Sequence, residues 1–168
     1  MILDRSYFTA SADVLARDLV GKLLCRRTPD GTVRARITET ECYLGEEDTA
    51  CHAHKGRTRR TEPMYSEGGI TYVYLCYGIH SLLNLVTGEK DHPEAVLIRG
   101  IEGASGPGRV TKRLSVTLSD NSVPLAEESG IWLEDDGYRP RRILRLPRVG
   151  IDYASPRDRA RKWRFLAE

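Results

Sequence analysis

The segment VRARITETECY, residues 33–43, decides the fold that we expect for this chain. Its apolar and polar residues alternate, which predicts a strand. A turn at Pro29-Asp30-Gly31 precedes it, and residues 22–27 supply the partner strand of a hairpin. Strand periodicity predicts that one face carries Val33, Ala35, Ile37, Glu39, Glu41 and Tyr43. This face begins apolar and ends acidic, as expected for a strand that leaves the core at a functional site.

Strand and helix signals follow one another along the rest of the chain without a dividing linker. Further strands are predicted at residues 71–77, 81–87, 95–101, 131–134 and 142–149. Short helices are predicted after Thr9 or Ser11 with Val14, Leu15 and Leu19 on one side, from Gly106 to about Leu114, and around residues 158–163. Residues 45–69 show no period, so we expect a long functional or disordered loop. The 168 residues therefore predict one mixed α/β domain over residues 1–168.

Composition excludes several classes of protein. The 26 basic and 24 acidic residues nearly balance, which excludes a uniformly basic coat protein and a disordered polyelectrolyte. The longest apolar run, residues 72–77, is far shorter than the ~20 residues of a membrane helix. No signal-peptide pattern is visible, so we expect a cytoplasmic or otherwise intracellular protein. Four scattered cysteines (Cys25, Cys42, Cys51 and Cys76) predict buried free thiols.

The balanced total charge conceals segregated charge. Residues 55–60 hold four cations, and residues 139–164 hold ten basic residues against two acidic ones. Local basic surface is what a polyanion contacts, and its affinity comes from released counterions. The alternative is that these cations are solvated or paired with neighbouring acids.

Three features have side chains suited to catalysis. Glu39 and Glu41 lie within ~7 Å along one strand, so one is a candidate general base, and an exposed acidic strand end is the alternative. Arg99 ends an apolar segment and requires an anion: Glu41, another acid or a phosphate. Cys51 and His52 open a stretch that can bind metal, but no further ligand pair completes a zinc site, so we expect no metal. A nucleophilic Cys–His pair is the remaining alternative there.

Three of the eight tyrosines fall within six residues. Tyr72 and Tyr74 share one face, either as core residues or as platforms for base stacking. Tyr77 precedes Gly78 at a predicted turn, so we expect it to protrude as wedge residues do.

These motifs, in this order, resemble the alkyladenine (methylpurine) DNA glycosylases. The matching residues are TETECYLG (38–45), Asp48, His52, GRT (56–58), Met64, YVYLCYGIH (72–80), Asn84, AVLIR (95–99) and GPG (106–108). LVGKLL (19–24), RVGI (148–151) and WRF (163–165) extend the resemblance to nearly the whole chain. It implies an α+β fold, a single compact domain whose curved, antiparallel-rich sheet is edged by helices.

The resemblance also implies an activity. Such enzymes are monofunctional hydrolases that flip a damaged purine out of duplex DNA and cleave its N-glycosidic bond, leaving an abasic site. The implied roles are Glu41 as general base, Arg99 holding the water, Tyr43, His52 and Tyr74 as pocket walls, Asn84 crowding the amine of normal guanine, and Tyr77 as the intercalating wedge. Neither a metal nor another cofactor is implied. We expect a monomer whose partner is double-stranded DNA, with the basic clusters (Lys55, Arg57 and residues 139–148) touching phosphates.

The chain departs from the family pattern in four places. Cys42 replaces the usual alanine between the glutamate and the tyrosine, and residues 112–115 are more polar than the usual Ala-Leu-Gly. Thr61-Glu62-Pro63 stands where an asparagine commonly precedes Met-Phe, and Lys162 stands where a proline commonly precedes Trp-Arg-Phe. We expect these changes to affect substrate range and stability more than activity. Two other functions remain open: a non-catalytic damaged-DNA-binding module on the same fold, which needs neither Glu41 nor Arg99, and a small-molecule hydrolase using Cys51 and His52.

Overall fold

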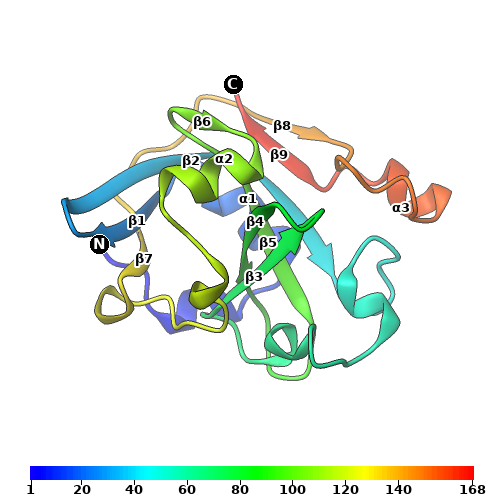
Figure 1. Ribbon diagram of the computed structural model, residues 1–168. Coiled ribbons are helices and arrows are strands. Elements are labelled where there is room, and N and C mark those ends of the chain that lie inside the picture. The colour runs from blue at the N-terminus through cyan, green and yellow to red at the C-terminus, as the bar shows by residue number, and fades with distance from the viewer.

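Strand β2 (Gly31–Leu44) organises the sheet, because it is long enough to pair with different strands along its two halves. The computed structural model describes residues 1–168, and Figure 1 shows β2 arching across the molecule. Its first half pairs with β1 (Leu23–Thr28), and its second half pairs with β5 (Glu94–Ile101) and β9 (Arg164–Ala167). The remaining strands are β3 (Thr71–Cys76), β4 (His80–Val86), β6 (Ala104–Ser105), β7 (Ile131–Glu134) and β8 (Ile143–Leu146).

All pairs in this nine-stranded sheet are antiparallel. The order β3-β4-β5-β2-β1-β7 forms the main path, β6 pairs with β5, and β8 pairs with β9. The predicted α+β class and single domain are confirmed, and so are all the predicted strands, although several of their ends shift. β6 and β9 were not predicted: β6 has only two residues, which carry no periodicity, and β9 directly follows the segment in which a helix was expected.

Three short α-helices and five 3₁₀ turns complete the chain. The α-helices are α1 (Ala12–Leu19), α2 (Pro107–Arg113) and α3 (Pro156–Ala160). The 3₁₀ turns are Arg5–Thr9, His52–Lys55, Glu62–Tyr65, Leu118–Asp120 and Glu127–Ser129. Two of these turns give order to the predicted loop 45–69. No helix has the length and apolar character needed to cross a membrane.

Two helix predictions require correction. Val14 is 58% exposed, and the buried side of α1 is formed by Ala12, Leu15, Ala16 and Leu19. The N-terminus of α1 is bound by Glu94, which accepts a hydrogen bond from the Ala12 N–H at 2.9 Å. The last helix ends at Ala160, and the chain then extends into β9.

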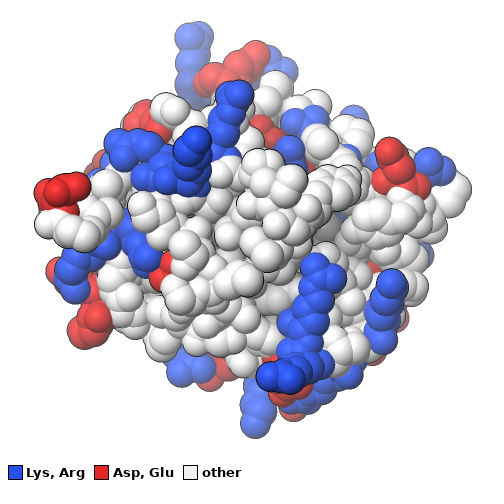
Figure 2. All heavy atoms as spheres, in the orientation of Figure 1, with Lys and Arg blue, Asp and Glu red and all other residues white.

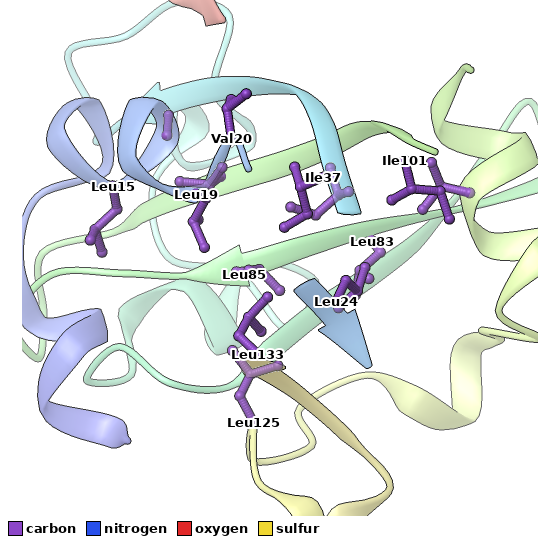
Figure 3. Packing of buried hydrophobic residues seen from close by; sticks show 14 of the residues in the cluster. Leu15, Leu19, Val20, Leu24, Ile37, Leu83, Leu85, Ile101, Leu125 and Leu133 are labelled. Carbon is purple, nitrogen blue, oxygen red and sulfur yellow. The ribbon is translucent and has the colours of Figure 1, made fainter. Parts of the chain in front are cut away.

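The main core lies between α1, α2 and the sheet. It contains 25 buried residues, including side chains from α1, α2 and eight strands. Figure 3 shows Leu15 and Leu19 of α1 directed toward the strands that carry Ile37 and Leu85. Burial of a leucine or isoleucine side chain stabilises a fold by about 1.5–3 kcal/mol, so this cluster supplies the main driving force for folding.

The parity of the residues that face this core changes at Glu39 of β2, both along β2 and along its partner β5. The register shifts on both sides of Glu39, which lies opposite Gly100. Along β2, Ile37 enters the core before the shift and Cys42 enters it afterwards, so odd positions give way to even ones. A local irregularity of this kind redirects side chains in a ladder.

This change corrects the prediction that residues 33–43 keep one face throughout. Ala35 and Ile37 face the core, whereas Glu41 and Tyr43 face a cleft on the other side of the sheet. The acidic end of the strand therefore leaves the core because the ladder is interrupted. Simple alternation would have placed Glu41 among apolar side chains.

Gly100 lies at this interruption and leaves room for it. A Cβ atom there would lie 2.8 Å from the Thr38 hydroxyl and 3.3 Å from the Glu39 Cβ. We expect Gly100→Val to lower the free energy of unfolding by about 1–3 kcal/mol, as overpacking does. Urea denaturation measures the change. Ser105→Val, across the ladder at an exposed position, is the control and should stay within about 0.5 kcal/mol of wild type. Equal stabilities of the two variants would contradict this account.

Candidate active site

A cleft of about 560 Å³ opens beside the end of β2, and we call it the main cleft. Its walls come from β2, the β3–β4 turn, β5, the start of α2 and the segment 149–153. A small inner pocket of about 30 Å³ adjoins it and shares Tyr43, Tyr74 and Tyr153 with it. Segments far apart in the sequence thus meet where β2 emerges from the core.

Glu41 is fully buried at the wall of the main cleft, and both of its oxygens are engaged. Oε1 accepts a hydrogen bond from the Tyr43 hydroxyl at 2.9 Å, and Oε2 accepts one from the Val149 N–H at 2.6 Å. Burial raises the pKa of Glu41, while the nearby positive charge of Arg99 and these two donors oppose the rise. The result is a fixed carboxylate with more basic character than a solvated one.

Arg99 joins the two glutamates that the sequence pairs. Its Nε donates to Glu39 Oε1 at 2.9 Å, and its Nη1 lies 3.6 Å from Glu41 Oε1. Glu39 also lies 3.6 Å from Arg164 Nη1. The expected anionic partner of Arg99 is therefore both acids, with the closer contact to Glu39.

Aromatic rings form the walls of the inner pocket. The rings of His52 and Tyr74 have centroids 4.5 Å apart, and those of Tyr72 and Tyr74 are 5.5 Å apart. His52 Nδ1 contacts the Tyr72 hydroxyl at 2.9 Å. Burial, with the charges of Arg60 and Lys55 nearby, lowers the pKa of His52 to about 4, so its ring is neutral at pH 7.

Asn84 lies at the same pocket. It is buried, pairs with Tyr72 across the β3–β4 ladder, and donates from Nδ2 to the Tyr72 carbonyl at 3.2 Å. The structure therefore gathers Tyr43, His52, Tyr74 and Asn84 around one pocket, as the resemblance implies.

Tyr77 protrudes from the β3–β4 turn, as predicted. Its side chain is 92% exposed, and its φ of 52° lies in the left-handed region. A non-glycine residue rarely adopts this conformation, and backbone strain of that kind costs about 1–3 kcal/mol. Gly78 follows with a φ of 66°. The turn thus holds a large aromatic ring in solvent beside the main cleft.

A buried ion pair underlies this site. Arg148 and Asp48 form two hydrogen bonds of 2.7 and 2.9 Å, and neither side chain is more than 1% exposed. The Arg148 guanidinium also lies 5.0 Å from the Tyr43 ring centroid and 4.9 Å from that of Trp163. Arg148 directly precedes Val149. The same segment therefore packs a guanidinium against the Tyr43 ring and donates a hydrogen bond from the Val149 N–H to Glu41.

The Lys and Arg side chains on the surface of the molecule divide into those that pair with a carboxylate and those that do not. Arg57 pairs with Glu62 and Asp91, and Arg139 pairs with Asp135. Two groups of exposed cations have no carboxylate within 4.0 Å: Lys55, Arg59 and Arg60 in the loop, and Arg109, Lys112 and Arg113 on α2. Arg141 and Arg145, from the expected stretch 139–148, are also exposed without such a partner. Figure 2 shows Lys and Arg gathered on either side of a broad uncharged face.

This distribution corrects the expected phosphate contacts. Arg148 is buried, so it is unavailable to a phosphate, and Arg57 is already neutralised by two acids. The unpaired loop and α2 cations flank the site instead. In the sequence the α2 group was visible only as the polar stretch 112–115 and was not assigned to phosphates, because three cations over five residues are common on solvated helices.

The cysteine and histidine stretch does not form a nucleophilic or metal site. Burial raises the pKa of the Cys51 thiol to about 12, which disfavours the reactive thiolate. His54 Nδ1 lies 2.8 Å from the Glu46 carbonyl, and His52 faces Tyr72. No group of three His, Cys, Asp or Glu side chains is placed to hold a metal ion. Cys25, Cys42 and Cys51 are buried as predicted, whereas Cys76 is half-buried.

Two of the departures from the family pattern, residues 61–63 and Lys162, make contacts only with their own surroundings. Thr61 is buried and donates to the Gly56 carbonyl at 3.1 Å, while Glu62 pairs with Arg57. Lys162 is exposed between α3 and β9, next to Trp163. None of the three side chains lines the main cleft or the inner pocket.

Comparison with known proteins identifies relatives over the whole chain. The family model described as Methylpurine-DNA glycosylase matches residues 6–104 and 102–168. A protein of Psychrobacter cryohalolentis is 44% identical over 192 residues, which cover 96% of this chain and 89% of its own length. A protein of Methanocella arvoryzae is 41% identical over 184 residues, covering 98% and 91%. Both are named "Putative 3-methyladenine DNA glycosylase".

The buried ion pair yields a prediction on stability. We expect Arg148→Met to lower the free energy of unfolding by about 3–5 kcal/mol, because Asp48 is left as an uncompensated buried charge. Arg139→Met, which removes an exposed partner of Asp135, is the control and should cost about 1 kcal/mol or less. Urea denaturation compares them, and the double variant Asp48→Leu/Arg148→Met should recover part of the loss. Similar losses for Arg148→Met and Arg139→Met would show that the pair contributes no more than a surface one.

Proposed function

The chain belongs to the methylpurine-DNA glycosylase family, and from that premise we propose how its residues perform the reaction. It is a 3-methyladenine DNA glycosylase of base excision repair, a hydrolase of the N-glycosidic bond in damaged DNA. Water supplies the oxygen that bonds to C1′ of the sugar. The bond from C1′ to the purine nitrogen breaks, and its electron pair leaves with the base.

Glu41 is the general base in this proposal. The observation that carries the assignment is its full burial at the main cleft, with both oxygens fixed and its pKa raised. A carboxylate of raised pKa accepts a proton from water more readily, and proton transfer of this kind contributes about 10²–10⁴-fold. Its negative charge also stabilises the positive charge that develops on the sugar.

Arg99 and Glu39 act together beside this base. Arg99 lies close enough to Glu41 to help hold the attacking water at the cleft. Glu39 keeps Arg99 in place through the 2.9 Å hydrogen bond, which makes it a positioning residue. This division of roles supports Glu41, the fully buried carboxylate, as the general base of the two glutamates.

The inner pocket receives the flipped base. Methylation at N3 makes a purine cationic, and a cation is attracted to the faces of Tyr43 and Tyr74. A neutral His52 ring stacks without opposing that charge. Asn84 limits the pocket at the base edge, where the amine of normal guanine would clash.

Tyr77 fills the place in the stack that the flipped nucleotide leaves. Its exposure and its rigid turn support this role, because a wedge must reach the duplex without rearranging. The unpaired cations of the loop and of α2 contact the phosphates on either side. A monomer, a cytoplasmic location and independence from metals and cofactors remain predictions.

Excision of damaged purines tests the assignment of Glu41. Single-turnover assays on duplex oligonucleotides carrying hypoxanthine, 1,N6-ethenoadenine or alkylated purines should give alkali-labile sites at the lesion with wild type. Glu41→Gln should lower the rate by about 10²–10⁴-fold, the contribution of the base. Glu39→Gln should lower it only about fivefold, because a neutral acceptor weakens the hydrogen bond from Arg99 by about 1 kcal/mol.

Binding to duplex DNA with an abasic analogue is the control for folding, and both variants should keep wild-type affinity. Equal losses for Glu41→Gln and Glu39→Gln would contradict the assignment. Wild-type protein that binds damaged DNA yet cleaves no lesion would favour the non-catalytic damaged-DNA-binding module.

Salt dependence tests the phosphate contacts. Each contact contributes about 0.9 to the slope of log affinity against log salt. We expect Arg60→Ala and Lys112→Ala each to reduce that slope by about one, measured by fluorescence anisotropy on the abasic-analogue duplex. Arg57→Ala is the matched control, because its charge is already paired with Glu62 and Asp91. A slope reduced as much by Arg57→Ala as by Arg60→Ala would refute the assignment.

A further inference from the structure

The inner pocket is narrow for its proposed occupant. Its volume of about 30 Å³ holds roughly two water molecules, whereas a purine has nine ring atoms. The main cleft beside it measures about 560 Å³. A flipped base therefore lies in close contact with the walls of the inner pocket, and a base with an additional fused ring fits only if one wall moves.

Most walls of this pocket are fixed by several contacts. The Tyr43 hydroxyl donates a hydrogen bond to Glu41, and the Tyr43 ring lies against the Arg148 guanidinium. Tyr72, Tyr74 and Asn84 belong to the paired strands β3 and β4. His52 is also held by the Tyr72 hydroxyl. Moving the Tyr43 ring would break its hydrogen bond to Glu41, and moving the His52 ring would break its contact with Tyr72 and separate it from the Tyr74 ring.

Tyr153 is the exception. Its side chain is 67% exposed, and one hydrogen bond of 2.7 Å, from its hydroxyl to the Ala50 carbonyl, holds it across the pocket. It lines the inner pocket, the main cleft and a third cavity of about 670 Å³, the outer cleft, on the side of Lys55 and Arg60. Space is thus available for the ring on either side of its present position.

The backbone beneath Tyr153 is anchored independently of the ring. Ile151 and Ala154 are buried against Ala50 in a separate small cluster. Val149, at the start of this segment, donates to Glu41. The tyrosine ring can therefore rotate while the segment keeps its contact with the proposed catalytic base.

We propose that Tyr153 is a movable wall that admits the flipped base into the inner pocket, closes on it, and limits the size of base that is excised. This inference rests on the proposed function. Opening breaks the bond to the Ala50 carbonyl, and closure re-forms it when the base leaves room. A small base permits closure, whereas a base with an additional fused ring obstructs it.

Two substitutions separate the parts of this proposal. Tyr153→Phe keeps the ring and removes the bond to Ala50, whereas Tyr153→Ala removes the wall. The substrates are duplexes with hypoxanthine, a small base, or 1,N6-ethenoadenine, which has an extra fused ring and is fluorescent. Tyr138→Ala, at a half-exposed tyrosine that packs on Arg36 and lines neither the cleft nor the pocket, is the control.

We expect Tyr153→Ala to raise the ratio of single-turnover excision rates, ethenoadenine over hypoxanthine, at least about tenfold, the scale of discrimination by a small steric difference. Tyr153→Phe should speed capture of ethenoadenine, followed by stopped-flow fluorescence, about two- to tenfold, because one hydrogen bond opposes opening. Its ratio of excision rates should equal that of wild type, as should that of Tyr138→Ala.

An unchanged ratio in Tyr153→Ala, or proportional loss of both rates, would overturn the proposal and leave Tyr153 as a fixed part of the wall. Wild type that captures ethenoadenine but excises neither base would overturn the proposed function alone. In that case the capture rates of Tyr153→Phe and wild type still decide whether the wall moves, and equal rates would overturn the proposal.

Discussion

The buried ion pair between Arg148 and Asp48 connects the parts of the chain that form the site. Asp48 also accepts hydrogen bonds from the Leu44 and Ala50 N–H groups, so it orders the start of the long loop. Arg148 donates to the Cys42 and Asp158 carbonyls, which ties the end of β2 to α3. Burying two charges is costly unless their geometry is good and their remaining groups are satisfied. Here nearly all are satisfied, the Arg148 Nε being the exception.

The interrupted ladder between β2 and β5 explains how a carboxylate becomes buried without being in the apolar core. Ile37 and Cys42 keep β2 attached to the core on both sides of the interruption, while Glu41 faces Arg99 and the Val149 N–H. Its charge is compensated by fixed partners rather than by water, which is the arrangement that shifts a pKa without neutralising the group. The same strand therefore contributes to stability with one face and to chemistry with the other.

The features of the fold that depend on local signals could be predicted from the sequence. Alternation predicted the strands, and the glycine after Tyr77 predicted that its ring protrudes, but the resemblance was needed to distinguish Glu41 from Glu39. The interruption at Glu39 was missed, because it depends on the pairing of β2 with β5 and is invisible in either strand alone. The support of Tyr43 by Arg148 was missed for a similar reason, since 105 residues separate them (148 − 43). Tyr153 carries no signal of its own: only the cavities that it separates single it out.

If Glu41 activates the water, its ionisation must control the pH dependence of single-turnover excision at saturating enzyme. Hypoxanthine is a suitable lesion, because its protonation does not change between about pH 4.5 and 7. We expect the rate to fall as the pH is lowered, with a one-proton limb whose midpoint lies above 4.5, the ordinary pKa of a glutamate, because Glu41 must be ionised. The limb should disappear in the residual activity of Glu41→Gln. A limb that persists in Glu41→Gln, or a wild-type rate independent of pH over this range, would contradict the account.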